Sequence, residues 1–157
     1  MIMEGDVLES CVPHRGRMAL LSRVVTYDFS EGTLTSEVDI KESDLFFDRE
    51  QGGVPSWVGF EYMAQSIAAL SGIKRRLELQ EQPRIGFIMG VRNFTSTTAV
   101  FAAGRRVQVE VRQVFRDGDT ASFECRIREN GAEQARAIIN AIEAGEGLLP
   151  AMGGTGG

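Results

Sequence analysis

The sequence has very little of the residue types that build metal and redox centres. Its 157 residues include one histidine, His14, and two cysteines, Cys11 and Cys125. One histidine cannot form a histidine-rich metal site, and cysteines this far apart form no C-x-x-C pair, so the common zinc and thiol-redox signatures are absent. We therefore expect no metal and no cofactor, and we expect both cysteines to be free thiols.

Excess positive charge and a membrane-spanning segment are also lacking. Lysine and arginine total 17 against 22 acidic residues, whereas a nucleic-acid partner requires a basic surface. Residues 1–9 are acidic and contain no apolar core of a signal peptide. The longest apolar stretch, Trp57 to Ile73, is shorter than the ~20 residues that span a bilayer. These absences predict a cytoplasmic protein that binds neither nucleic acid nor membrane.

The stretch from Trp57 to Ile73 is apolar or small on every side of a helical wheel and carries one charge, Glu61. Such a pattern predicts a helix, over about residues 57–76, that is buried all round. A carboxylate in such surroundings is costly unless it is paired, protonated or used in chemistry. Glu61 is therefore the first candidate for a functional residue.

The rest of the chain has the alternation of β-strands. We expect a hairpin before the helix, with strands over Met18–Tyr27 and Thr33–Ile40. After the helix the dipeptides Asp117-Gly118 and Asn130-Gly131 predict tight turns between antiparallel strands. In one strand, alternation places Val107, Val109, Val111 and Phe115 on the buried face. The predicted later strands are Arg84–Thr95, Arg106–Arg116, Ala121–Arg128 and Glu133–Ile142.

A long helix that is apolar on all sides needs a sheet that curls around it. The predicted fold is therefore α+β, a hotdog fold in which a curved antiparallel sheet wraps a long central helix. The length suits one domain, over residues 1–143. Residues 144–157 have the glycine-rich composition of a disordered tail.

Two motifs resemble those of a known enzyme family. The first is VPHRGRMALLSRV, which resembles the LPHRxPxLLxDRV signature of the 3-hydroxyacyl-(acyl carrier protein) dehydratases. The second is PSWVGFEYMAQ, which resembles their central-helix motif, a proline-led turn followed by E-x-M-A-Q. The segments GGVPSWVG and RIGFIMGVRNF are similar to the branch found in aryl-polyene biosynthesis clusters. The resemblance covers roughly residues 7–143 and implies dehydration of 3-hydroxyacyl thioesters to 2-enoyl thioesters.

One departure from the family concerns catalysis. In the housekeeping dehydratases the loop before the central helix carries a catalytic histidine in a G-H-F-P-G segment. The corresponding loop here is FFDREQGGVPSWVG, which has no histidine. The family's helix carboxylate and glutamine correspond to Glu61 and Gln65, and His14 is the candidate for the missing base, within one subunit or across a dimer interface. A structural interpretation, in which His14 only fixes its loop, stays open.

The reaction needs a base for the C2 proton, an acid for the departing C3 hydroxyl and donors for the thioester oxygen. Gln65 is a candidate substrate-binding residue, with a structural or helping role as the alternative. The backbone amides of Gly52, Gly53 and the start of the helix, at Trp57 and Val58, are candidates to bind the thioester. The structural interpretation is that the glycines serve a turn and the helix residues the core.

A basic cluster suggests how a carrier could bind. Lys74, Arg75 and Arg76 follow the apolar helix, and Arg15 and Arg17 lie within the first motif. These side chains are candidates to dock an acyl carrier protein or the phosphate of a CoA-type thioester. The simpler interpretation is a solvated helix end.

Two other functions fit the same residues. The chain could be a non-catalytic or weakly active subunit of a heteromeric dehydratase, in which a paralogous hotdog subunit supplies the histidine. It could also be a hotdog acyl thioesterase, in which Glu61 activates water or attacks the thioester. The sequence leaves a homodimer and a heterodimer equally open.

Overall fold

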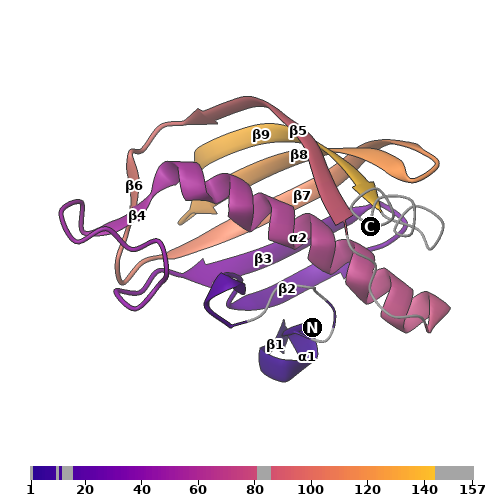
Figure 1. Cartoon of the computed structure of the whole chain (residues 1–157), viewed down its shortest axis with the longest axis horizontal. Coiled ribbons are helices and arrows are strands. Elements are labelled where there is room, and N and C mark those ends of the chain that lie inside the picture. Colours follow the sequence, from indigo (N-terminus) through magenta and orange to yellow (C-terminus); the bar gives the residue numbers. More distant parts are fainter. Residues whose placement is uncertain (1, 10, 12–15, 81–85, 144–157) are drawn as a thin grey trace, which may run out of the picture.

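The computed structural model describes residues 2–9, 11, 16–80 and 86–143. Seven antiparallel strands form one curved sheet in the order β1-β2-β3-β7-β8-β9-β5. A single long helix, α2, crosses one face of this sheet (Figure 1). The strands are β1 Met3–Glu4, β2 Arg23–Asp28, β3 Thr33–Asp39, β5 Gly86–Ser96, β7 Arg106–Asp117, β8 Thr120–Glu129 and β9 Ala132–Glu143. This is the hotdog arrangement predicted from the sequence.

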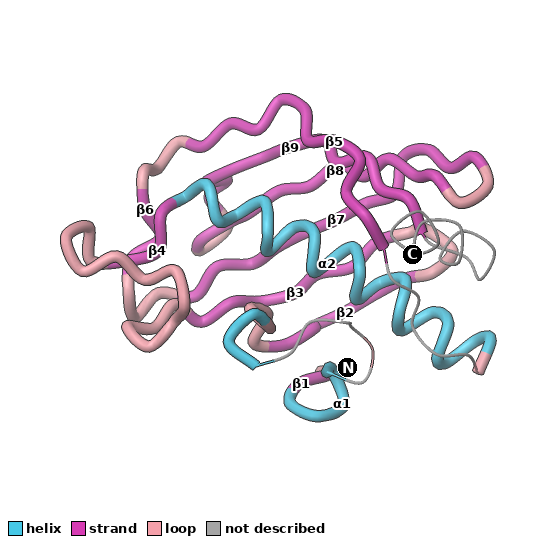
Figure 2. Tube along the Cα trace, viewed as in Figure 1, coloured by secondary structure: helices cyan, strands magenta, loops and turns pink. Residues whose placement is uncertain are grey.

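The central helix is built from three consecutive segments. A 3-10 turn, η2 Ser56–Val58, leads into α2 Gly59–Lys74, and a π-helical segment, η3 Arg75–Leu79, continues it. The helix predicted over about residues 57–76 is therefore confirmed and is a few residues longer. At its N-terminal end, β4 Gly53–Pro55 pairs with β6 Val100–Ala102, next to the loops that precede β4 (Figure 2).

The N-terminal region is less regular than the sequence indicated. A short helix, α1 Gly5–Glu9, follows β1, and η1 Gly16–Met18 is a 3-10 turn. The first predicted strand therefore begins at Arg23 and not at Met18, because the backbone amide of Leu20 bonds the Gln65 side chain instead of a neighbouring strand. Within the described residues, no helix is both long and apolar enough to cross a membrane.

Both predicted tight turns are present. Asn130 and Gly131 have φ of 50° and 80°, the left-handed values that a two-residue hairpin turn requires, and they join β8 to β9. The prediction for Phe115 is wrong, because its side chain is 59% exposed. A register shift between Gln113 and Phe115 in the β7–β8 pairing interrupts the alternation, and the side chains at the end of β7 are exposed on both faces.

The core lies between α2 and the concave face of the sheet. Val107, Val109 and Val111 of β7 are buried there with Met63 and Ile73 of the helix. Burying each such side chain stabilises the fold by ~1.5–3 kcal/mol. Cys11 and Cys125 are also buried, as free thiols.

The prediction that the helix is buried all round is wrong for the single chain. The sheet covers one side of α2, and within the described part of the chain no helix or strand lies over the opposite side along the first turns of the helix (Figure 1). The residues left half-exposed there lie three or four apart, as expected for one helical face. We call this set the open face of α2: Phe60, Glu61, Ala64 and Ala68. Ser71 is also half-exposed, but it bonds Glu143 of β9.

Candidate active site on the central helix

Glu61 lies in the first turn of α2, on the open face. It is half-buried, so the expectation of a carboxylate enclosed in the core is wrong for this chain. No hydrogen bond or ion pair joins its side chain to any described residue. The carboxylate is therefore available to a substrate or to a second chain.

Gln65 lies one turn after Glu61 and is 2% exposed. Its Nε2 donates to the carbonyl oxygen of Met18 at 2.7 Å, and its Oε1 accepts from the amide of Leu20 at 2.9 Å. Both ends of the amide are thus bound to backbone groups within the first motif. Gln65 fixes that segment beside the helix turn that carries Glu61, and its role in binding substrate stays a prediction.

A small cavity lies against Gln65. It has a volume of about 210 Å³ and is enclosed by α1 and by the segment after η1. His14 and Arg15, the candidate base and one candidate carrier-binding residue, lie outside the described residues, between Cys11 and Gly16. The pairing of His14 with Glu61 stays a prediction.

The loop before the helix does not offer the amides that the sequence suggested. The backbone amides of Gly52 and Gly53 both donate to the carbonyl oxygen of Asp48, at 2.9 and 3.3 Å. Gly52 has φ of 71°, and a Cβ at Gly53 would collide with the carbonyl oxygen of Phe101. Both glycines therefore serve the turn and the close approach of β6, and their amides are not free to bind a thioester oxygen.

Trp57 and Val58, at the start of the helix, face in different directions. The Trp57 side chain is 55% exposed, and its ring meets that of Phe46 edge-on with centroids 5.8 Å apart. Val58 is fully buried in the core. Only Trp57 of the two has a side chain that a substrate could touch in this chain.

Tyr62 was not among the predicted site residues, because an aromatic residue at helical spacing is typical of a core. Its ring packs near that of Phe101, with centroids 6.0 Å apart, and the residue is buried. No described residue hydrogen-bonds its hydroxyl. Burial raises the pKa of Tyr62 well above its ordinary value, so the hydroxyl stays protonated and is a neutral donor inside the fold.

The side chains of the predicted basic cluster do not all face solvent. Arg17 is exposed and donates to the carbonyl oxygen of Ser43 at 3.2 Å. Lys74 and Arg76 are exposed, but Arg75 is buried and its Nη1 lies 3.9 Å from the carboxylate of Glu143. Arg75 is therefore turned inward and unsuited to docking a carrier protein. Across the described ranges, no three His, Cys, Asp or Glu side chains gather to hold a metal ion.

Comparisons with known proteins identify the family of the chain. A family profile described as ApeP-like, ApeP dehydratase, matches residues 7–148. A curated relative is the 3-hydroxyacyl-[acyl-carrier-protein] dehydratase FabZ of Chlamydia caviae, 25% identical over 149 residues that cover 90% of this chain and 86% of the relative.

Solved structures show the same fold. The dehydratase heterocomplex ApeI:P from Xenorhabdus doucetiae contains a chain with a TM-score of 0.83 and 22% identity, covering 92% of this chain and 95% of that one. A hypothetical thioesterase from Streptococcus pneumoniae, solved with coenzyme A, has a TM-score of 0.60 and 11% identity, covering 78% and 84%. At these identities the structural similarity establishes the hotdog fold and nothing finer.

Proposed function

The chain belongs to the ApeP-like family of dehydratases, and we propose that it converts 3-hydroxyacyl thioesters to 2-enoyl thioesters in fatty-acid-like or aryl-polyene synthesis. The thioester would be carried by acyl carrier protein or by CoA. The observation that supports this most directly is Glu61, which corresponds to the family's helix carboxylate and has no polar partner among the described residues.

In the proposed reaction a base removes the C2 proton, the electron pair of that bond forms the C2–C3 double bond, and the C3–O bond breaks. Glu61 in its protonated form gives its proton to the departing hydroxyl, which leaves as water. His14 is the proposed base. Since the amides of Gly52 and Gly53 are bound to Asp48, the amides of the first helical turn, near Trp57, are the remaining candidates to stabilise the thioester oxygen.

A second hotdog subunit is part of the proposal. The open face of α2 is uncovered, and β5 is the edge strand of the sheet with Ile88, Met89 and Val91 exposed. An exposed apolar edge strand is a ready site for pairing with another sheet. The relative solved as a dehydratase heterocomplex supports a partner of the same fold. We propose that a second copy or a paralogue covers both features and completes the active site around Glu61.

Carrier binding is assigned to the exposed basic side chains. Arg17, Lys74 and Arg76 are exposed, and each can therefore meet a phosphate or an acidic carrier surface.

The test is turnover of a 3-hydroxyacyl thioester by the purified chain, alone and with a paralogous hotdog subunit, followed by the ultraviolet absorbance of the conjugated enoyl product. Glu61→Gln should lower kcat at least about 100-fold, the usual contribution of a general acid. The matched control is Glu78→Gln, since Glu78 is exposed near the other end of the helix. Unchanged turnover in Glu61→Gln would remove Glu61 from the mechanism.

The same assay separates the second candidate function, a non-catalytic or weakly active subunit of a heteromeric dehydratase. The absence of a histidine from the loop before the helix favours it. Inactivity alone with activity restored by a partner would support it, whereas a homodimer active alone would reject it. Release of free thiol without enoyl product would identify a thioesterase.

A further inference from the structure

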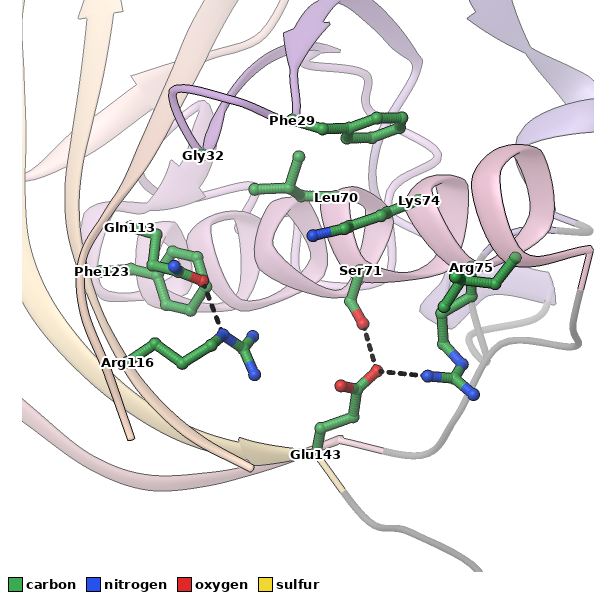
Figure 3. Close-up of a pocket in the computed structure, with 11 residues that line it drawn as sticks. Phe29, Gly32, Leu70, Ser71, Lys74, Arg75, Gln113, Arg116, Phe123 and Glu143 are labelled. Carbon is green, nitrogen blue, oxygen red and sulfur yellow. Dashed lines mark hydrogen bonds and ion pairs between the residues drawn. The ribbon is translucent and has the colours of Figure 1, made fainter. Parts of the chain in front are cut away.

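A second cavity lies toward the other end of α2. It has a volume of about 260 Å³ and is enclosed by the last turns of the helix, the turn between β2 and β3, and strands β7 and β8 (Figure 3). Lys74, on its rim, is 13 residues after Glu61. At ~1.5 Å per residue, this is about 20 Å along the helix axis. The cavity is thus separate from the proposed active site.

One part of the wall of this cavity is apolar. Leu70 of the helix and Phe123 of β8 are buried side chains that line it, and Phe29 of the β2–β3 turn is half-buried beside them. The π-helical segment Arg75–Leu79 borders the same space, and Leu79 lines it. Wide helical turns of this kind are found frequently at functional sites.

The carboxylate of Glu143, which lines the cavity, already has two partners within the chain. Ser71 donates to Oε1 of Glu143 at 2.5 Å, and Nη1 of Arg75 lies 3.9 Å from the same oxygen. These contacts are marked in Figure 3. Glu143 and Arg75 therefore offset each other and leave no negative charge to balance a further cation.

Two further cations line the cavity. Nε of Arg116 donates to Oε1 of Gln113 at 3.1 Å, and Nη1 donates to the carbonyl oxygen of Gly118 at 3.1 Å. Both acceptors are neutral, so they hold the guanidinium in place without offsetting its charge. Lys74 has no hydrogen bond or ion pair to any described residue. Figure 3 shows Lys74 extending from the helix and Arg116 from the strand side, toward the same space.

We propose that this cavity binds a small organic monocarboxylate, with its carboxylate between Lys74 and Arg116 and its apolar body against Leu70 and Phe123. An arginine fork and a lysine suit a planar carboxylate. Inorganic phosphate would make no use of the apolar walls, and a neutral apolar molecule would leave both cations unmatched. The proposal goes beyond the dehydratase function and does not depend on it.

The test is titration of the full chain with hexanoate, with the neutral hexanamide and with inorganic phosphate, followed by calorimetry and by backbone amide NMR signals. Hexanoate should bind saturably and shift the signals of Leu70 and Lys74, and hexanamide should bind at least about tenfold more weakly, because it lacks the charge. Three results would overturn the proposal. They are saturable binding of phosphate but not of hexanoate, binding of hexanamide as tight as that of hexanoate, and no saturable binding of any of the three compounds.

Variants locate the site. Lys74→Met and Arg116→Met keep an apolar stem and should each weaken hexanoate binding about tenfold, whereas Lys74→Arg should keep it. The control is Arg49→Met, which removes the same charge from an exposed loop residue that does not line the cavity. If Arg49→Met weakened hexanoate binding equally, the loss would be due to the change in net charge of the protein, and the assignment of the site would be overturned. The comparison of hexanoate with hexanamide needs no variant, so it decides even if a variant misfolds.

Discussion

The side-chain amide of Gln65 holds the backbone of Met18, with Nε2 donating to the Met18 carbonyl oxygen at 2.7 Å. The same amide accepts from Leu20 at 2.9 Å, so one buried side chain satisfies two backbone groups of an irregular segment. The segment would otherwise leave those groups unpaired against the helix, which is costly in a protein interior. Gln65 is in this way the link between the first sequence motif and the second.

Replacing Gln65 by leucine should lower the free energy of unfolding by about 2 kcal/mol, because it leaves the part-buried Leu20 amide and Met18 carbonyl without their partner. Urea denaturation followed by circular dichroism measures the change. The control is Gln134→Leu on β9, whose side-chain amide bonds no described residue. Equal stability of Gln65→Leu and Gln134→Leu would show that the two hydrogen bonds do not stabilise the fold.

Asp39 at the end of β3 should make stability depend on pH. The Arg23 guanidinium beside it, which hydrogen-bonds the carboxylate, holds the pKa of Asp39 at about 2, below its ordinary 3.8. Nε of Arg106 adds a bond of 2.7 Å. The folded state therefore binds fewer protons than the unfolded state in this range, and the contribution of Asp39 is present above about pH 4 and is lost as the pH falls toward 2.

We therefore expect Asp39→Asn to lower the free energy of unfolding by about 1 kcal/mol at neutral pH, as for partly exposed ion pairs. The difference from the native protein should shrink between about pH 4 and pH 2. Asp119→Asn, in the exposed turn after β7, is the control and should change little. A constant difference across this pH range would show that Asp39 and its arginines do not form the pair in solution.

Gly72 shows that a helix glycine can be required by packing. A Cβ at this position would collide with the carbonyl oxygen of Cys11, which crosses the helix there. Glycine to alanine in an open helix position stabilises by ~1 kcal/mol, but here we expect Gly72→Ala to destabilise by more than about 2 kcal/mol. Thermal unfolding compares it with Gly90→Ala, where a Cβ meets nothing within 4 Å. A stabilised Gly72→Ala protein would contradict this packing.

Local patterns were enough to predict most of the fold. Alternation identified β3 and most of β7, and the Asn130-Gly131 dipeptide identified its hairpin, because both signals arise within a few residues. The bulge that exposes Phe115 was missed because register depends on the opposite strand.

The candidate site was predicted less completely. Gly52 and Gly53 could be recognised as turn residues, but the sequence does not state that their amides bond Asp48, since that depends on loop geometry. The half-exposure of Glu61 was missed because an apolar helix looks the same whether one chain or two chains cover it. Gln65 was identified, but its bonds to Met18 and Leu20 are contacts across 45 or more residues that no local pattern encodes.

The open face of α2 provides the test of a partner subunit. Ala64 and Ala68 are half-exposed there, and their small side chains let a second helix approach closely. Ala68→Arg should be tolerated by the single chain, since the added side chain can extend to solvent, but it should block that approach. Light scattering after gel filtration should then give the mass of one chain for the variant and of two chains for the native protein. If the partner is a paralogous subunit, the native protein should form a complex with it and the variant should not. The control is Ala132→Arg, an equal change at an exposed position on β9. If Ala68→Arg assembles like the native protein, the open face is not the interface, and completion of the site at Glu61 by a second subunit must be given up.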